Sequence, residues 1–209
     1  MTVRPWRRVW LHARGVSAAG LGVLALGPFA CALTTAVALP ADVGAPADQA
    51  SIAGHADTVV VSVALASVFA GLLMLILVDR TAWMTRTGAR VAWLDRAVWL
   101  GAVCGVWFAL HLAASLLLPP QPGQFTLFLT YPALWLGIGL CAVTWGGPIA
   151  GSLAPVLVCM VMSLNAVPWP YNVVFNPHVA DVRMAITVVL LILGACVYCR
   201  SGHREPVTS

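Results

Sequence analysis

Few residues in this sequence could do chemistry, and the most notable is a histidine inside an apolar run. His111 lies near the middle of the charge-free run from Ala97 to Leu118. An ionisable side chain at membrane depth indicates a substrate or proton path, unless a backbone carbonyl or a hydroxyl group satisfies it. Both interpretations stay open, and Asn165 near the end of another apolar run shares them. Because no second histidine lies in an apolar run, the sequence predicts neither a haem nor a metal site.

Other groups that could catalyse a reaction lack the partners they need. Cys196 and Cys199 form a C-x-x-C pair, but no β-α-β pattern surrounds it and no second pair completes a zinc site. Ser152 lacks the G-x-S-x-G elbow, and the last apolar run contains no histidine base. The eleven basic residues are all arginine, which excludes a P-loop lysine. We therefore predict no catalytic residue, no cofactor and no enzymatic activity for this chain.

Arginines and tryptophans alternate between Asp79 and Arg96. At helical spacing, Arg86 and Arg90 can face water while Trp83 and Trp93 lie at the level of lipid headgroups. One interpretation is an interfacial anchor. The other is a short amphipathic helix that binds a cytoplasmic partner, because arginine and tryptophan often dominate the binding energy of protein interfaces.

The composition shows what kind of structure must position these residues. Hydrophobic residues make up 61% of the 209 residues, charged residues only 9%, and the mean hydropathy is +0.93. Soluble domains have about 25% charged residues. The chain is therefore predicted to be an integral membrane protein. Its net charge of +4 does not indicate nucleic acid binding, because the arginines do not gather on one soluble face.

The apolar runs predict a single all-α transmembrane domain over residues 1–209. A membrane-spanning helix needs about 20 mostly apolar residues. Six runs approach or exceed this length, at about residues 15–39, 58–78, 97–118, 125–145, 148–166 and 184–199. Only Gly146 and Gly147 separate the fourth run from the fifth, so these two runs must be antiparallel neighbours.

The distribution of arginine predicts the orientation of the chain. With six spans, both termini lie on the same side of the membrane. If that side is the cytoplasm, ten of the eleven arginines are cytoplasmic and only Arg183 is outside. Cytoplasmic loops carry the excess of arginine in membrane proteins. We therefore predict a multi-pass protein of the cell membrane with both termini in the cytoplasm and a cytoplasmic loop at residues 79–96.

Small residues and a proline inside the runs indicate how the helices pack. Gly101 with Gly105, and Ser67 with Gly71, are spaced four residues apart. Such pairs allow helices to approach closely in a membrane, either within the chain or at a dimer face. Pro132, inside the fourth run, is expected to kink its helix or to free a carbonyl group.

The overall layout resembles the membrane subunit of small ABC exporters of high-GC Gram-positive bacteria, whose ATPase is a separate chain. The shared features are a basic aromatic segment at Arg4–Trp10, the arginine-rich loop at 79–96, a tight hairpin at 146–147 and the Pro168-Trp169-Pro170 break. The resemblance implies that the loop, here about Thr81 to Leu94, is a coupling helix that binds the ATPase. The sequence lacks the glutamate often found near that loop in the family.

Several functions are compatible with these features. The resemblance implies a permease subunit that pairs with a second permease chain and a cytoplasmic ATPase and exports a peptide, a lipid-like or a drug-like molecule. A scaffold or accessory subunit that transports nothing is the main alternative. A vitamin-capturing subunit of an energy-coupled importer is a third. All three place the chain among membrane lipids, and we expect none of them to bind nucleic acid.

Overall fold

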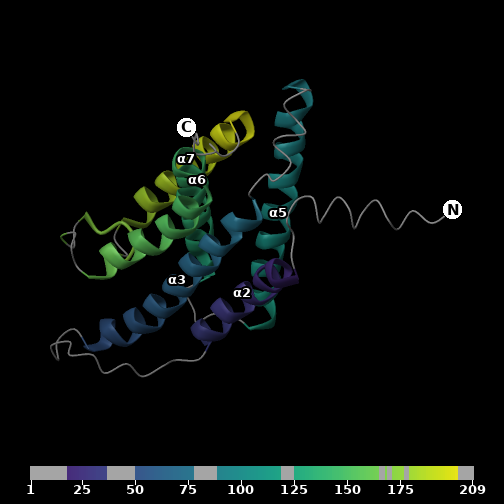
Figure 1. Cartoon of the computed structure of the whole chain (residues 1–209). Helices are drawn as coiled ribbons and strands as arrows, with labels where there is room; N and C mark the ends of the chain where they lie inside the picture. The colour runs from purple at the N-terminus through teal and green to yellow at the C-terminus, as the bar shows by residue number, and fades with distance from the viewer. Residues whose placement is uncertain are drawn as a thin grey trace.

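The computed structural model describes residues 18–36, 50–77, 89–118, 125–164, 168, 171–176 and 179–201. In these ranges all regular structure is helical (Figure 1), which confirms the all-α prediction. The helices are α2 (Ala18–Ala36), α3 (Ala50–Ile76), α5 (Ala89–Leu117), α6 (Phe125–Ser163) and α7 (Ala180–Ser201).

The helices expose the apolar surface that a membrane protein requires. Among the described residues, three stretches are long and apolar enough to cross a membrane: Trp93–Leu117 in α5, Phe128–Ser163 in α6 and Ala180–Ser201 in α7. The apolar stretches Gly20–Thr34 of α2 and Val61–Ile76 of α3 are shorter. Leu116, Ile149 and Leu164 are each more than 70% exposed. Soluble monomers rarely expose large apolar patches, so the protein is membrane-associated.

Helix α6 folds back on itself at a glycine. Gly147 has φ 77° and ψ −171°, outside helical values and in a region that favours glycine. A Cβ atom added at Gly151 would lie 2.7 Å from the Cβ atom of Val143, although these positions would be about 12 Å apart along a straight helix. The two limbs of α6, residues 125–146 and 148–163, therefore lie side by side, as the sequence predicted.

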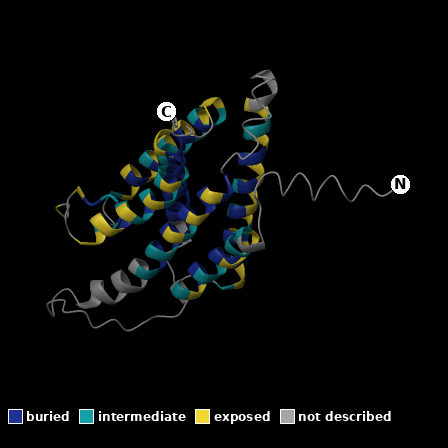
Figure 2. Ribbon diagram, in the orientation of Figure 1, coloured by how far each residue is buried: buried dark blue, intermediate teal, exposed yellow. Residues whose placement is uncertain are grey.

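The core forms around α3, which packs mainly against α6 and also against α2 (Figure 1). Helix α7 covers α6 and α5 lies beside α2. Buried residues line the contacts between helices, and exposed residues face outward (Figure 2). One core cluster includes Leu73, Trp107, Leu136 and Tyr198. A second includes Cys31, Val63, Phe128 and Trp135. The second cluster positions the site described below.

The predicted small-residue pairs of α3 and α5 differ in their packing. At Gly71, an added Cβ atom would overlap the backbone carbonyl oxygen of Ser152, so this glycine allows α3 to approach the second limb of α6. At Gly101 and Gly105, an added Cβ atom would meet nothing within 4 Å. The predicted packing role is therefore confirmed for Gly71, whereas the pair in α5 packs against none of the described residues and a dimer face stays its predicted role.

Three helices begin earlier than the hydropathy predicted. Helix α3 begins at Ala50 rather than Thr58, α5 at Ala89 rather than Ala97, and α7 at Ala180 rather than Met184. Residues 89–96 of the predicted cytoplasmic loop form the first turns of α5. Charge-free runs mark the apolar part of a helix, whereas the backbone hydrogen bonds of a helix continue through polar residues. The prediction therefore underestimated these helices at their polar ends.

Candidate functional site

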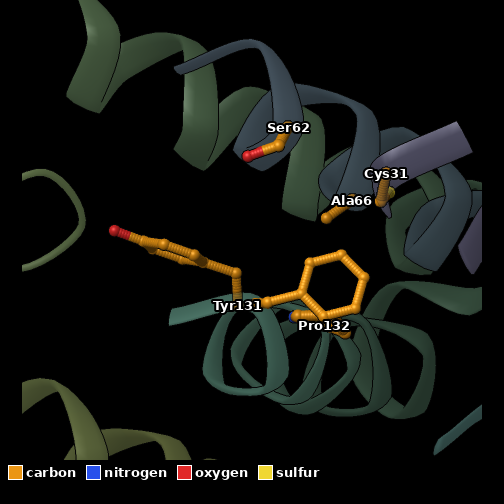
Figure 3. Close-up of a pocket in the computed structure, with 6 residues that line it drawn as sticks. Cys31, Ser62, Ala66, Tyr131 and Pro132 are labelled. Atoms are coloured by element: carbon orange, nitrogen blue, oxygen red, sulfur yellow. The ribbon is translucent and has the colours of Figure 1, made fainter. Parts of the chain in front are cut away.

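A small cavity lies where α2, α3 and α6 meet (Figure 3). Its volume is about 10 Å³, enough for one water molecule. The residues that line it are Cys31 of α2, Ser62 and Ala66 of α3, and Phe128, Tyr131 and Pro132 of α6. Two ionisable residues of other helices contact this wall of α6: His111 of α5 contacts Phe128, and Arg183 of α7 contacts Tyr131.

Pro132 weakens α6 at the cavity wall. A proline inside a helix has no amide hydrogen, so the carbonyl group of Phe128, four residues earlier, loses its helical donor. This turn of α6 is therefore one backbone hydrogen bond short, and tertiary contacts have to hold it in place.

Tyr131 and Arg183 supply such contacts. The Tyr131 hydroxyl group donates a hydrogen bond of 2.6 Å to the carbonyl oxygen of Val174. Arg183 Nη1 donates to the same carbonyl at 3.0 Å, and at 3.4 Å to the Val173 carbonyl and to the Tyr131 hydroxyl oxygen. The guanidinium carbon lies 5.2 Å from the centroid of the Tyr131 ring, within the range of a cation–π interaction. These bonds join α6, residues 173–174 and the first turn of α7.

Residues 171–176 are held in position by a buried asparagine. The Asn172 side-chain amide donates to the Met162 carbonyl at the end of α6, at 2.9 Å. Its side-chain oxygen accepts from the Phe175 backbone amide at 3.0 Å, which closes a local turn. The carbonyl groups that Arg183 reaches are therefore presented by an ordered turn.

The charge of Arg183 is buried without an opposite charge among the described residues. Its side chain is only 2% exposed, and its Nη1 partners are two carbonyl groups and one hydroxyl group. Its Nε atom is buried and has no hydrogen-bond partner. A buried charge costs several kcal/mol unless it is paired or well hydrogen-bonded. Among the described residues, the partners that hold Arg183 are therefore neutral dipoles.

His111 is enclosed by aromatic rings. Its Nδ1 atom lies 3.0 Å from the Trp107 carbonyl oxygen, and because a carbonyl group only accepts, Nδ1 carries the hydrogen. The ring centroids of Trp107 and Phe128 lie at 4.5 Å and 5.5 Å. Its Nε2 atom is buried and unpartnered. In the part of the chain that the structure describes, no three histidine, cysteine or acidic residues could share a metal ion.

The other predicted site residues are only partly described. Trp93 lies in the first turns of α5 and is 54% exposed, which leaves it available to lipid or to a partner. Arg90 belongs to the same helix, but its side chain is not among those described. Trp83, Arg86 and Asn165 lie outside the described residues. Of the predicted site residues, the structure therefore describes the side chains of only Trp93 and His111, both on α5.

Tyr131, Asn172 and Arg183 were not among the site residues predicted from the sequence. One signal pointed to Arg183: it is the single arginine that the charge distribution places away from the other ten. An isolated charge at the end of an apolar run has to find partners or remain in water, and here it is buried. No known protein family, curated protein or solved structure matches this chain.

Proposed function

We propose that this chain is the membrane permease subunit of an ABC-type transporter and exports a peptide, a lipid-like or a drug-like molecule. It would pair with a second permease chain, and a separate cytoplasmic ATPase would hydrolyse ATP. The chain would cross the cell membrane of a high-GC Gram-positive bacterium six times, with α2, α3, α5, the two limbs of α6 and α7 as spans. Both termini would be cytoplasmic.

Two sets of hydrogen bonds support this path through the membrane. The Tyr198 hydroxyl group near the end of α7 donates to the Leu77 carbonyl after α3, and the proposal puts both residues on the cytoplasmic side. The Tyr131 hydroxyl group donates to the Val174 carbonyl, and the proposal puts both residues on the outer side. Adding or removing a single span between Leu77 and Tyr198 would put those two residues on opposite sides of the membrane.

The main support for the proposal is that α5 is continuous. This helix runs unbroken from Ala89 to Leu117 over 29 residues, about 43 Å. It contains Arg90 and Trp93 of the predicted coupling segment at one end and the buried His111 three-quarters of the way along. A movement imposed on the first turns by an ATPase would therefore reach the core as a rigid-body displacement.

Co-purification from native membranes tests the proposal. We expect an ATP-hydrolysing subunit to co-purify with the tagged chain in mild detergent. Alanine at Trp83, Arg86, Arg90 and Trp93 together should lower its recovery at least about tenfold, the effect expected from losing contacts worth more than about 1 kcal/mol each.

Trp145→Ala is the matched control, because Trp145 is 71% exposed and lies next to the hinge that the proposal puts on the same side of the membrane. This variant should retain the ATPase. The proposal fails if no ATPase co-purifies, or if a label applied outside intact cells reaches position 86.

A scaffold that transports nothing is a second candidate. It is favoured by Gly101 and Gly105, whose open face on α5 could receive a helix of another membrane protein. A complex that keeps its composition but shows no ATP-dependent transport in vesicles would favour this alternative.

A further inference from the structure

We infer that Tyr131 and Arg183 form a latch that closes the cavity between α2, α3 and α6 on the side of residues 171–176. The inference depends on the proposed function only in treating the cavity as part of an export path. The latch itself is defined by the contacts of these two residues and could exist in a scaffold as well.

Tyr131 links the cavity to residues 171–176 through opposite ends of one rigid side chain. Its ring forms part of the cavity wall, and its hydroxyl group points away from Ser62, Ala66 and Cys31 (Figure 3). The hydroxyl group is held by the Val174 carbonyl at 2.6 Å. Because a phenol ring cannot bend, fixing the hydroxyl group also fixes the wall.

Arg183 binds the same two groups. Its Nη1 atom reaches both the Val174 carbonyl that Tyr131 binds and the Tyr131 hydroxyl oxygen. The hydroxyl group is therefore held by the Val174 carbonyl and the guanidinium group together, and the guanidinium carbon also lies 5.2 Å from the centroid of the ring. Three parts of the chain have to separate before the ring can swing out of the wall.

The chemistry of these contacts makes the latch releasable. A buried carboxylate would bind the guanidinium group strongly, whereas the partners here are neutral and two of the three Nη1 bonds are 3.4 Å long. The Nε atom of Arg183 has no partner to lose. Water entering from the side of residues 171–176 could replace each contact with one of similar strength.

The accessibility of the Cys31 thiol can report whether the cavity is open. It lines the cavity on the wall opposite the Tyr131 hydroxyl group and is 2% exposed (Figure 3). While the latch is closed, a polar thiol reagent cannot reach it. Once the Tyr131 ring swings out, the cavity opens toward residues 171–176 and the thiol becomes reachable from there.

The test is the rate at which a small, membrane-impermeant methanethiosulfonate reagent labels Cys31. The chain is reconstituted in lipid vesicles with the other five cysteines replaced by alanine. Tyr131→Phe keeps the ring but removes the hydroxyl group, and it should label about fivefold faster, the change expected from losing one buried hydrogen bond of average strength. Arg183→Lys keeps the charge but cannot reach all three acceptors, and it should also label faster.

Tyr198→Phe is the matched control, because this variant also removes a tyrosine hydroxyl group that donates to a backbone carbonyl. Its Cys31 should label at the original rate. A second reporter chain keeps only Cys104 of α5, which is partly buried in the other core cluster. Tyr131→Phe should leave the labelling of Cys104 unchanged.

Three results would overturn the latch: unchanged Cys31 labelling in both Tyr131→Phe and Arg183→Lys, an equal increase at Cys104, or an equal increase in Tyr198→Phe. The last two would indicate general loosening of the bundle. None of these measurements involves an ATPase, so the latch and the proposed transport function can fail independently.

Discussion

The two ends of the bundle are each fastened by a tyrosine hydroxyl group that donates to a backbone carbonyl, but in different surroundings. At the Tyr198 end, the ring is fully buried in the core cluster that contains Leu77 and Trp99. At the Tyr131 end, the ring borders a cavity and lies beside the buried charge of Arg183. The same type of hydrogen bond is therefore found at a packed apolar end and at an end that contains a buried charge and a cavity.

The difference shows where the molecule retains the capacity to change. Apolar packing is lost gradually as contacts are removed, and little of it can be exchanged for water without cost. A set of polar contacts around a cation can be exchanged for water almost bond for bond. We therefore expect the Tyr198 end to act as a fixed base and the Tyr131 end to open, and substitutions at the two ends can test this.

Reversing the charge of Arg183 should have the largest effect. Arg183→Glu removes the guanidinium donor from the Val173 and Val174 carbonyl groups and places an acid against their oxygen atoms, and the Tyr131 hydroxyl group still donates to Val174. It should lower the free energy of unfolding by at least about 3 kcal/mol. Unfolding in mixed detergent, followed by the fluorescence of the nine tryptophans, measures the loss.

Arg183→Met is the matched variant, because it removes the donors but also the cost of burying the charge. Its loss should be at most about half as large. Equal losses in the two variants would mean that the charge of Arg183 has no role at this end of the bundle.

Asn172→Ala should have the next largest effect. It removes one donor to the Met162 carbonyl and one acceptor for the Phe175 amide, both inside the protein. We expect a loss of about 2 kcal/mol, since each bond contributes about 1 kcal/mol. Asn172→Asp retains the acceptor for Phe175 but places a buried carboxylate against the Met162 carbonyl oxygen, so at neutral pH it should lose more than the alanine variant. A smaller loss than in the alanine variant would contradict the burial of this side chain.

The sequence predicted the apolar elements of this fold much better than the site. Apolar runs located the helices, and two adjacent glycines located the fold-back of α6 at Gly147, because both features are local. The starts of α3, α5 and α7 were placed too late because polar residues continue these helices.

The site depends on contacts that no local pattern contains. Tyr131 bonds to a residue 43 positions away, and Arg183 to one 52 positions away. Such pairs form only when α6, residues 171–176 and α7 have been brought together by packing. Charge distribution singled out Arg183, but it placed that residue outside the membrane and could not reveal its burial.

Tyr198→Phe tests the end that we expect to stay closed. The Leu77 carbonyl lies where the helical bonds of α3 end and loses the tyrosine donor in this variant. We expect a loss of about 1.5 kcal/mol in the free energy of unfolding. An increase in Cys31 labelling in this variant would contradict the assignment of fixed and opening ends.

Tyr131→Phe should have the smallest effect on stability, although it should have a large effect on access. The Val174 carbonyl keeps Arg183 Nη1 as a donor at 3.0 Å, so removing the hydroxyl group leaves no acceptor unsatisfied there. The loss should stay below about 1 kcal/mol, less than in Tyr198→Phe. The two tyrosine variants would then rank in opposite orders for unfolding and for Cys31 labelling. If the less stable variant were also the more accessible one, stability alone would explain access, and the difference between the two ends would have no functional meaning.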